Sequence, residues 1–132
     1  MKPVRIAVLG AGLVGRRHIE TIRALPHVAE LAAVVDPVAD RSQFHLGAAG
    51  WFSDSQEMLG QVEPEAVIIA TPNNLHVSQG LWCCERGIPF LVEKPVTATL
   101  EEAGQLVKAV ADSGVKTLTG LHRRYLPAVQ EA

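Results

Sequence analysis

Residues 4–15 of the 132-residue chain read VRIAVLGAGLVG, an apolar run followed by three glycines in the spacing Gly-x-Gly-x-x-Gly. The run is short, rich in β-branched residues and almost wholly apolar, which is typical of a strand buried on both faces. A helix is expected over 13–25, where Pro26 ends the pattern. The expected inner stripe of that helix consists of Val14, His18, Ile22 and Leu25. The sequence therefore predicts a strand, a tight glycine turn and a helix in direct succession.

The same alternation continues along the chain. Further strands are expected at 31–35, near 51–52, and at 66–70, 90–92 and 116–121. Further helices are expected at 54–60, 74–86 and 99–113, with a poorly formed one within 37–53. The expected N-caps are Asp54 and Thr99, and the expected helix ends are Gly87 and Gly114. This alternation predicts an α/β fold: a doubly wound, mainly parallel sheet (Rossmann fold) in three α/β/α layers.

Composition narrows the classes of partner. The chain carries 12 basic and 14 acidic residues, so no basic face for nucleic acid is expected. No apolar run approaches the roughly 18 residues that span a bilayer, and no signal-peptide pattern precedes the first strand, so a cytoplasmic protein is expected. Cys83 and Cys84 are adjacent in a helical stretch, where a bridge is hard to form. They are expected to be packed thiols, and the spacing of cysteines predicts no metal site.

The glycine turn has the context that gives the motif its meaning. A strand precedes it, a helix follows, and Asp36 ends the next strand 21 positions after Gly15. Gly10 is expected to permit the tight turn, Gly12 to let a pyrophosphate approach the backbone, and Gly15 to let helix and strand approach each other. The N-terminus of the helix offers free N–H groups and a partial positive charge to phosphates. These features predict a dinucleotide site.

Asp36 indicates which dinucleotide the site prefers. A carboxylate at the end of the second strand can accept hydrogen bonds from the adenine ribose hydroxyls, and it repels a 2′-phosphate. NAD is therefore expected, with NADP less favoured. Arg41 lies close enough in the sequence to hold a 2′-phosphate, so NADP stays open as an alternative.

Polar residues also follow the later strands. In an open parallel sheet, ligands bind beyond the carboxyl ends of the strands. The fourth strand ends in "ATPNNLH", and Thr71, Asn73 and His76 are expected along the cofactor. An asparagine here can also cap the next helix, and His76 can equally be a packing residue.

The fifth strand ends in "FLVEKPVTAT", residues 90–99. Glu93 and Lys94 are poor core residues, since charged groups are costly to bury unpaired. The Lys94 ammonium can hydrogen-bond a substrate oxygen, stabilise the charge that develops there, and relay a proton. Glu93 can orient Lys94 or bond the nicotinamide ribose. Pro95 fixes the backbone, and the Lys94–Pro95 bond is a candidate cis peptide.

Taken in order, "GAGLVGRRH", "VVDP", "ATPNNLH", "VEKP" and "GLHRRYLPAV" resemble the Gfo/Idh/MocA oxidoreductase family. The resemblance implies a Rossmann domain at 1–122, with 123–132 starting a connection to a C-terminal α+β substrate domain absent from this chain. It also implies that the full-length parent is an NAD(P)-dependent dehydrogenase acting on a sugar, polyol or similar hydroxy or carbonyl compound. The parent is expected to be a homo-oligomer, and this chain alone is expected to turn over little or nothing.

The resemblance also assigns residues. Lys94 is the implied catalytic residue, and the implied cofactor residues are Gly10, Gly12, Leu13, Val14, Asp36, Thr71, Asn73, His76, Glu93, Lys94 and Arg124. His122 departs from the family, where asparagine is more often expected at its position. Two other functions remain open: an NAD-dependent glycosidase that uses transient oxidation, and a non-catalytic dinucleotide-sensing module.

Overall fold

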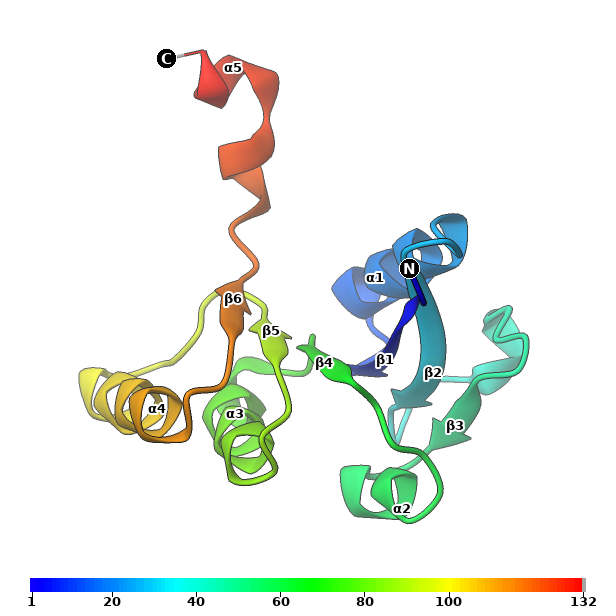
Figure 1. The fold of residues 1–132 in the computed structure, drawn as a ribbon, viewed down its shortest axis with the longest axis horizontal. Helices are drawn as coiled ribbons and strands as arrows, with labels where there is room; N and C mark the ends of the chain where they lie inside the picture. Colours follow the sequence, from blue (N-terminus) through cyan, green and yellow to red (C-terminus); the bar gives the residue numbers. More distant parts are fainter. Residues whose placement is uncertain (132) are drawn as a thin grey trace.

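The computed structural model describes residues 1–131, which form one parallel six-stranded sheet with helices on both faces (Figure 1). The strands are β1 Val4–Leu9, β2 Ala29–Val35, β3 Gly50–Phe52, β4 Ala66–Ile69, β5 Phe90–Val92 and β6 Thr117–Thr119. Their order is β3-β2-β1-β4-β5-β6, and every neighbouring pair is parallel. This is the Rossmann order, so the predicted fold class is confirmed.

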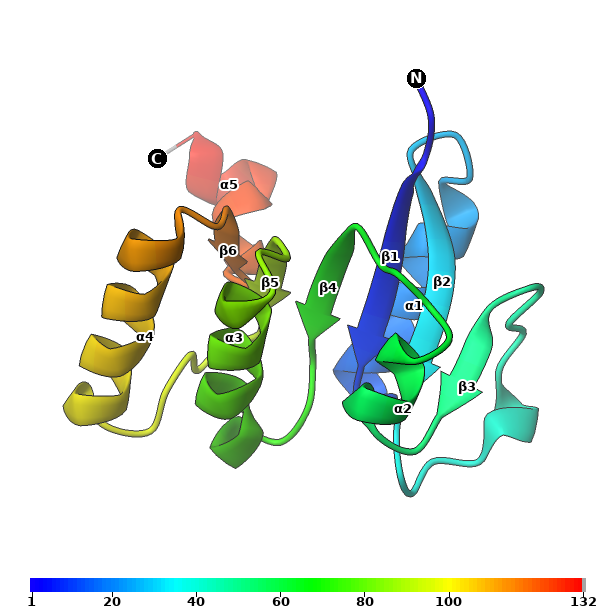
Figure 2. The same ribbon diagram turned by 60° about the horizontal axis from the view of Figure 1, so that its bottom comes forward.

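The helices divide between the two faces of the sheet. They are α1 Leu13–Ala24, α2 Ser55–Leu59, α3 His76–Glu85, α4 Leu100–Ser113 and the short α5 Pro127–Gln130. Figure 2 shows α1 behind the strands and α2, α3 and α4 in front of them. The connections therefore run outward from β1 on one face and from β4 on the other. The strand order reverses between β1 and β4, which is where such sheets bind ligands.

The core consists of two apolar layers, one on each side of the sheet. Val8 and Val34 pack with Ile19 of α1, whereas Leu9 and Ile69 pack on the face that α2, α3 and α4 cover. Because β1 is central, its Ala7, Val8 and Leu9 are all fully buried. This explains the unbroken apolar run in the sequence, since a strand covered on both faces has no polar side.

The predicted helix signals are confirmed where they are local. The Glu57 N–H donates to Asp54 Oδ1 (2.8 Å) and the Glu102 N–H donates to Thr99 Oγ1 (3.2 Å). Gly87 and Gly114 follow α3 and α4 with positive φ angles of 66° and 69°. The poorly formed helix within 37–53 is only a 3₁₀ turn, Arg41–Gln43.

The predicted inner stripe of α1 is confirmed at Ile22 and wrong at Val14 and Leu25. Val14 and Leu25 are 40% and 42% exposed, and the buried residues of the helix are Gly15, Ile19 and Ile22. The reason is the glycine turn, which places Gly15 rather than a bulky side chain against β1.

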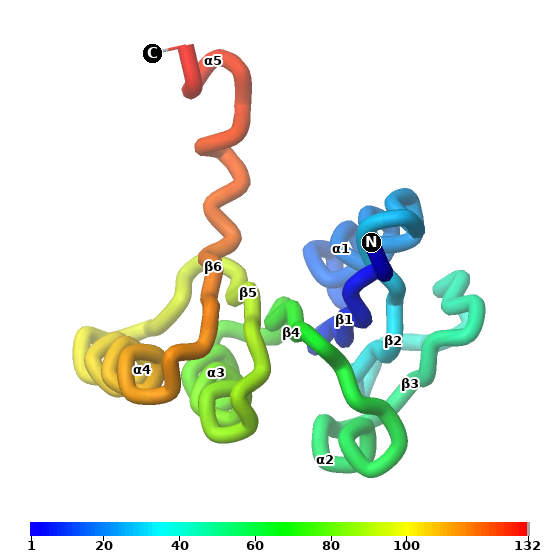
Figure 3. The backbone as a smooth tube through the Cα atoms, in the orientation of Figure 1, coloured from blue at the N-terminus to red at the C-terminus, as the bar shows by residue number. Residues whose placement is uncertain are grey.

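One half of the sheet is uncovered on one face. A groove of about 600 Å³ runs over β4, β5 and β6 on the α1 side, lined mainly by apolar groups such as Ile68, Leu91 and Leu118. Figure 3 shows the chain leaving β6 and running away from the sheet through the 3₁₀ turn His122–Tyr125 and α5. Among residues 1–131, no helix is long and apolar enough to cross a membrane.

Candidate functional site

A cleft of about 560 Å³ opens at the point where the strand order reverses. Its walls come from the carboxyl ends of β1, β2, β3 and β4 and from the start of α1. The lining residues include Gly10, Gly12, Leu13, Val14, Asp36, Ser53, Thr71, Leu75 and Gln79. The volume is within the usual range for small-molecule sites, about 300–1,000 Å³. Five of the predicted site residues from 10 to 36 thus meet in one place.

The three glycines of the turn have three different surroundings. Gly10 has φ +93°, and a Cβ there would collide with the Ala70 carbonyl. A Cβ on Gly15 would collide with the Gly10 carbonyl, but one on Gly12 would have nothing within 4 Å. Gly10 and Gly15 are therefore needed by the fold, whereas Gly12 leaves open space beside the cleft. Gly10 and Gly15 thus have the packing roles that the sequence predicted, and the approach of a pyrophosphate at Gly12 stays a prediction.

The start of α1 borders the cleft without a side-chain cap. Gly12 is its N-cap, and no side chain among the described residues caps the first turn. The unpaired N–H groups of that turn and the helix dipole favour a negative group at this end. Leu13 and Val14 are exposed on the cleft wall. Phosphate oxygens fit this cradle because the donors come from the backbone and no Cβ intervenes at Gly12.

Asp36 joins the glycine turn to the end of β2. Its Oδ2 accepts the Ala11 N–H (2.8 Å), and its Oδ1 accepts the N–H groups of Val38 and Ala39 (2.8 Å each). Burial by itself raises the pKa of Asp36, but the three backbone hydrogen bonds together outweigh burial and hold the pKa below its ordinary value of 3.8. The carboxylate is therefore charged at neutral pH and sits at the rim of the cleft.

Of the three site residues predicted after β4, only Thr71 is part of the cleft lining. Thr71 lines the cleft, and its hydroxyl donates to Gln79 Oε1. Asn73 is exposed at the start of the 3₁₀ turn Asn73–Leu75, outside the cleft lining. The His76 side chain is 1% exposed and lies beneath the loop rather than on the cleft surface. Both of its ring nitrogens contact backbone carbonyl oxygens.

The loop after β5 comes close to α1. Glu93 Oε1 lies 2.7 Å from His18 Nε2, and both side chains are largely buried. A Cβ on Gly120, which follows β6, would lie 2.6 Å from Glu93 Oε2, so this glycine makes room for the carboxylate. Lys94 is exposed, and the Lys94–Pro95 peptide is cis as predicted. The pair of His18 and Glu93 brings the helix of the glycine turn beside the loop that carries Lys94.

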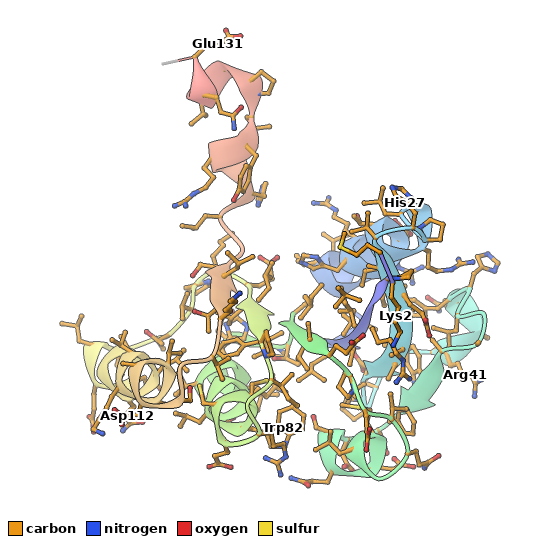
Figure 4. The ribbon with its side chains drawn as sticks, viewed as in Figure 1. Lys2, His27, Arg41, Trp82, Asp112 and Glu131 are labelled. Carbon is orange, nitrogen blue, oxygen red and sulfur yellow. The ribbon has the colours of Figure 1, made fainter. Side chains whose placement is uncertain are left out.

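The two candidate arginines lie away from the cleft. Arg124 is exposed in the segment that leaves the sheet after β6. Arg41 is on the connection between β2 and β3, at the outer edge of the sheet (Figure 4). It borders a separate shallow depression with Asp40 and Phe44. In this structure neither guanidinium forms part of the 560 Å³ cleft.

The remaining ionisable candidates are inert or absent from the site. Cys83 and Cys84 are buried and unbridged. Burial, and to a smaller extent the neighbouring Cys84, raises the pKa of Cys83 to about 12. The thiol therefore stays protonated and is a poor nucleophile. Within residues 1–131, no three His, Cys, Asp or Glu side chains gather closely enough to hold a metal ion.

Sequence reasoning missed four residues of this region: His18, Ser53, Leu75 and Gln79. His18 was assigned to the apolar stripe of the helix, although its place in "GAGLVGRRH" was part of the family resemblance. Leu75 and Gln79 are four positions apart at the start of α3, so they face the same side of the helix. That spacing was visible in the sequence, but which side of the helix faces the cleft was not.

Comparison with known proteins identifies the same family that the sequence motifs resemble. The family model described as "Oxidoreductase family, NAD-binding Rossmann fold" (GFO_IDH_MocA) matches residues 4–121. The scyllo-inositol 2-dehydrogenase (NAD(+)) of Bacillus subtilis strain 168 is 36% identical, over 98% of this chain and 39% of that protein. The chain thus spans about two fifths of the length of the curated relatives it matches.

Solved structures of dehydrogenases show the same fold over nearly the whole of this chain. The WlbA dehydrogenase of Bordetella pertussis, in complex with NADH and UDP-GlcNAcA, superposes with a TM-score of 0.90 at 27% identity, covering 98% of this chain and 40% of that one. The scyllo-inositol dehydrogenase of Lactobacillus casei, with bound NAD(H) and scyllo-inositol, gives 0.90 at 25% identity, covering 98% and 39%.

Proposed function

Because the chain belongs to the Gfo/Idh/MocA oxidoreductase family, we propose that residues 1–122 form the NAD-binding domain of a dehydrogenase. The observation that carries the proposal is the cleft itself. A capless helix N-terminus, a glycine with open space beside it and a charged Asp36 all border one cavity. A pyrophosphate needs the first two features and an adenine ribose needs the third.

The roles of the individual residues follow from these positions. The N–H groups at Gly12, Leu13 and Val14 hold the pyrophosphate, and Asp36 holds the ribose of adenosine. Asp36 also disfavours NADP, because its carboxylate would face a 2′-phosphate and no guanidinium lines the cleft in the described structure. Bound NAD supplies the hydride acceptor. The relatives named above, which use NAD or bind NADH, support this choice.

Lys94 is the proposed catalytic residue of the whole protein. When a carbonyl compound is reduced, the ammonium group of Lys94 donates a hydrogen bond and then a proton to the substrate oxygen that gains negative charge. Oxidation of the alcohol is the reverse, with neutral Lys94 taking the hydroxyl proton. Glu93 is held by His18, so it fixes the backbone from which Lys94 projects. Exposure of Lys94 leaves its side chain free to reach a substrate.

A second domain is part of the proposal. Two observations support it: the relatives are about two and a half times as long as this chain, and an apolar groove of about 600 Å³ lies uncovered over β4, β5 and β6. Residues 123–132 would lead to that domain, which would complete the substrate site. A polyol or sugar is the proposed substrate class, because relatives act on inositols or bind a nucleotide sugar.

Thermal denaturation in the presence of each dinucleotide tests the cofactor proposal in this chain. A ligand that binds only the folded state stabilises it by about 2.7 kcal/mol at a hundred times its Kd. NAD is expected to raise the melting temperature by several degrees at millimolar concentration, and NADP by clearly less. An unchanged melting temperature with both would refute the proposal.

The catalytic proposal needs the protein that joins this domain to a substrate domain. Lys94→Met is expected to reduce turnover of scyllo- or myo-inositol, the first substrates to try, by several orders of magnitude while NAD still binds. Full activity of this variant would remove Lys94 from the mechanism. Release of sugar without accumulation of NADH would indicate the glycosidase, and NAD binding with no turnover of any polyol would indicate the sensing module.

A further inference from the structure

His76 is the most deeply buried polar side chain in the part of the chain that the structure describes. It is the first residue of α3, and its side chain is 1% exposed. Nδ1 lies 2.8 Å from the carbonyl oxygen of Pro95, and Nε2 lies 2.9 Å from the carbonyl oxygen of Thr71. One ring thus contacts both the loop after β4 and the loop after β5. Its two partners, Thr71 and Pro95, are 24 positions apart in the sequence.

The two partners decide the protonation state that fits. A carbonyl oxygen can only accept a hydrogen bond, and a neutral imidazole has a single N–H. In either neutral tautomer one nitrogen lone pair would face a carbonyl oxygen at less than 3 Å. Turning the ring over would put carbon atoms opposite both oxygens. Both contacts are hydrogen bonds only when both nitrogens carry protons.

Among the described residues, only the two carbonyl oxygens are placed to stabilise a positive charge on this ring. No carboxylate among the described residues lies within ion-pair distance of His76. Of the charged groups on the segments that pack nearby, Glu93 is paired with His18, Lys94 is exposed, and Glu102 of α4 accepts the N–H of Ala98. A buried charge with hydrogen bonds but no counterion needs both of them, since hydrogen bonds to an ion are about twice as strong as neutral ones.

We propose that His76 is a positioning residue that, as an imidazolium, ties the loop bordering the cofactor cleft to the loop that carries Lys94. Thr71 lines the cleft and Pro95 follows Lys94 directly. Loss of one ring proton releases one of the two loops. The link between the loops stands on the hydrogen bonds alone, whereas its consequence for turnover rests on the proposed role of Lys94.

Nitrogen-15 NMR of the chain with labelled histidine tests the protonation state directly. At neutral pH both ring nitrogens of His76 are expected to show the shift of a protonated nitrogen. One unprotonated ring nitrogen in the folded chain would overturn the proposal. The exposed His27 serves as the reference in the same spectrum, and the signals of His76 are identified by their loss in His76→Asn. This measurement requires neither NAD binding nor catalysis.

Two matched substitutions separate the two bonds. An asparagine amide nitrogen occupies the place of Nδ1, so His76→Asn keeps the donor to Pro95. A glutamine amide nitrogen reaches the place of Nε2, so His76→Gln keeps the donor to Thr71. The carbonyl carbon-13 shift of Pro95 is expected to change in His76→Gln and stay in His76→Asn, with the opposite result for Thr71. Equal changes at both carbonyls in both variants would contradict the proposal.

Kinetics extend the same test to the longer protein that carries the substrate domain. His76→Gln is expected to lower kcat about tenfold or more with little change in the Kd for NAD, and His76→Asn to raise that Kd more than it lowers kcat. If NMR shows the doubly protonated ring but the kinetic split is absent, the link is retained and the role of Lys94 fails. A neutral ring with normal kinetics leaves Lys94 in place and removes the link.

Discussion

The glycine turn and the loop at residues 93–95 both follow buried parallel strands and lie at the same edge of the sheet, yet they are built differently. The glycine turn is closed by backbone packing, in which Gly10 and Gly15 leave no room for a side chain. The second loop holds Glu93 firmly against His18 but presents Lys94 to solvent. The difference supports the proposal that this chain supplies the dinucleotide end of the site, whereas a second domain completes the proposed catalytic end.

The largest effect is expected at the closed turn. Gly15→Ala would place a Cβ on the Gly10 carbonyl, where only backbone movement can relieve the collision. Loss of cooperative folding is expected, because the clash separates α1 from β1 at the centre of the sheet. Circular dichroism with thermal denaturation measures it. A variant that melts within a few degrees of the wild type would show that the turn is not closed as described.

Gly12→Ala is the matched change at the open position. Nothing lies within 4 Å of the added Cβ, so the melting temperature should stay nearly unchanged. The methyl group would keep a pyrophosphate off the helix N-terminus, and the Kd for NAD is expected to rise about a hundredfold, roughly 2.7 kcal/mol. Isothermal titration calorimetry measures it. Unchanged affinity would move the phosphates away from this turn.

Asp36→Asn sharpens the choice of dinucleotide. The new amide would turn an N–H group toward a backbone N–H at Ala11 or toward those at Val38 and Ala39, and the negative charge would be lost. The Kd for NAD is expected to rise about tenfold, as for loss of a hydrogen bond to a charged group. The preference for NAD over NADP should shrink at the same time. An unchanged ratio of the two affinities would separate Asp36 from the ribose.

Acid is expected to remove the stability that the Asp36 carboxylate contributes. Because the pKa of Asp36 is lowered in the folded state, its contribution to stability is complete above its ordinary value of 3.8 and is lost as the pH falls through the lower folded value. Asp36→Asn should therefore show a smaller loss of stability than the wild type below about pH 4. Urea unfolding between pH 2 and 6 measures the difference. Parallel profiles for the two proteins would be the contrary result.

The smallest effect is expected at the open loop. Lys94 is exposed, so Lys94→Met should leave the melting temperature of this chain within about one degree, as surface substitutions do. The Kd of this variant for NAD should change by less than about threefold, since Lys94 does not line the 560 Å³ cleft. Calorimetry and melting on the same sample measure both. A large loss of affinity would mean that Lys94 holds NAD rather than substrate.

The sequence predicted the features that depend on neighbouring residues. The glycine turn, the caps at Asp54 and Thr99, and the strand that ends before Glu93 all have their causes within a few positions. The contact between His18 and Glu93 joins residues 75 positions apart and depends on how α1 lies across the sheet. The same packing decides that Val14 faces the cleft and that His76 is buried, so apolar spacing could not reveal either.

Amide chemical shifts of the labelled chain during titration with NAD test most directly whether both loops take the same dinucleotide. Changes are expected at Gly12 and Leu13, at the residues beside Asp36, and also at Lys94 and Val96 in the loop after β5. Changes confined to the apolar groove over β5 and β6, or to the glycine turn without any at 94–96, would contradict this expectation.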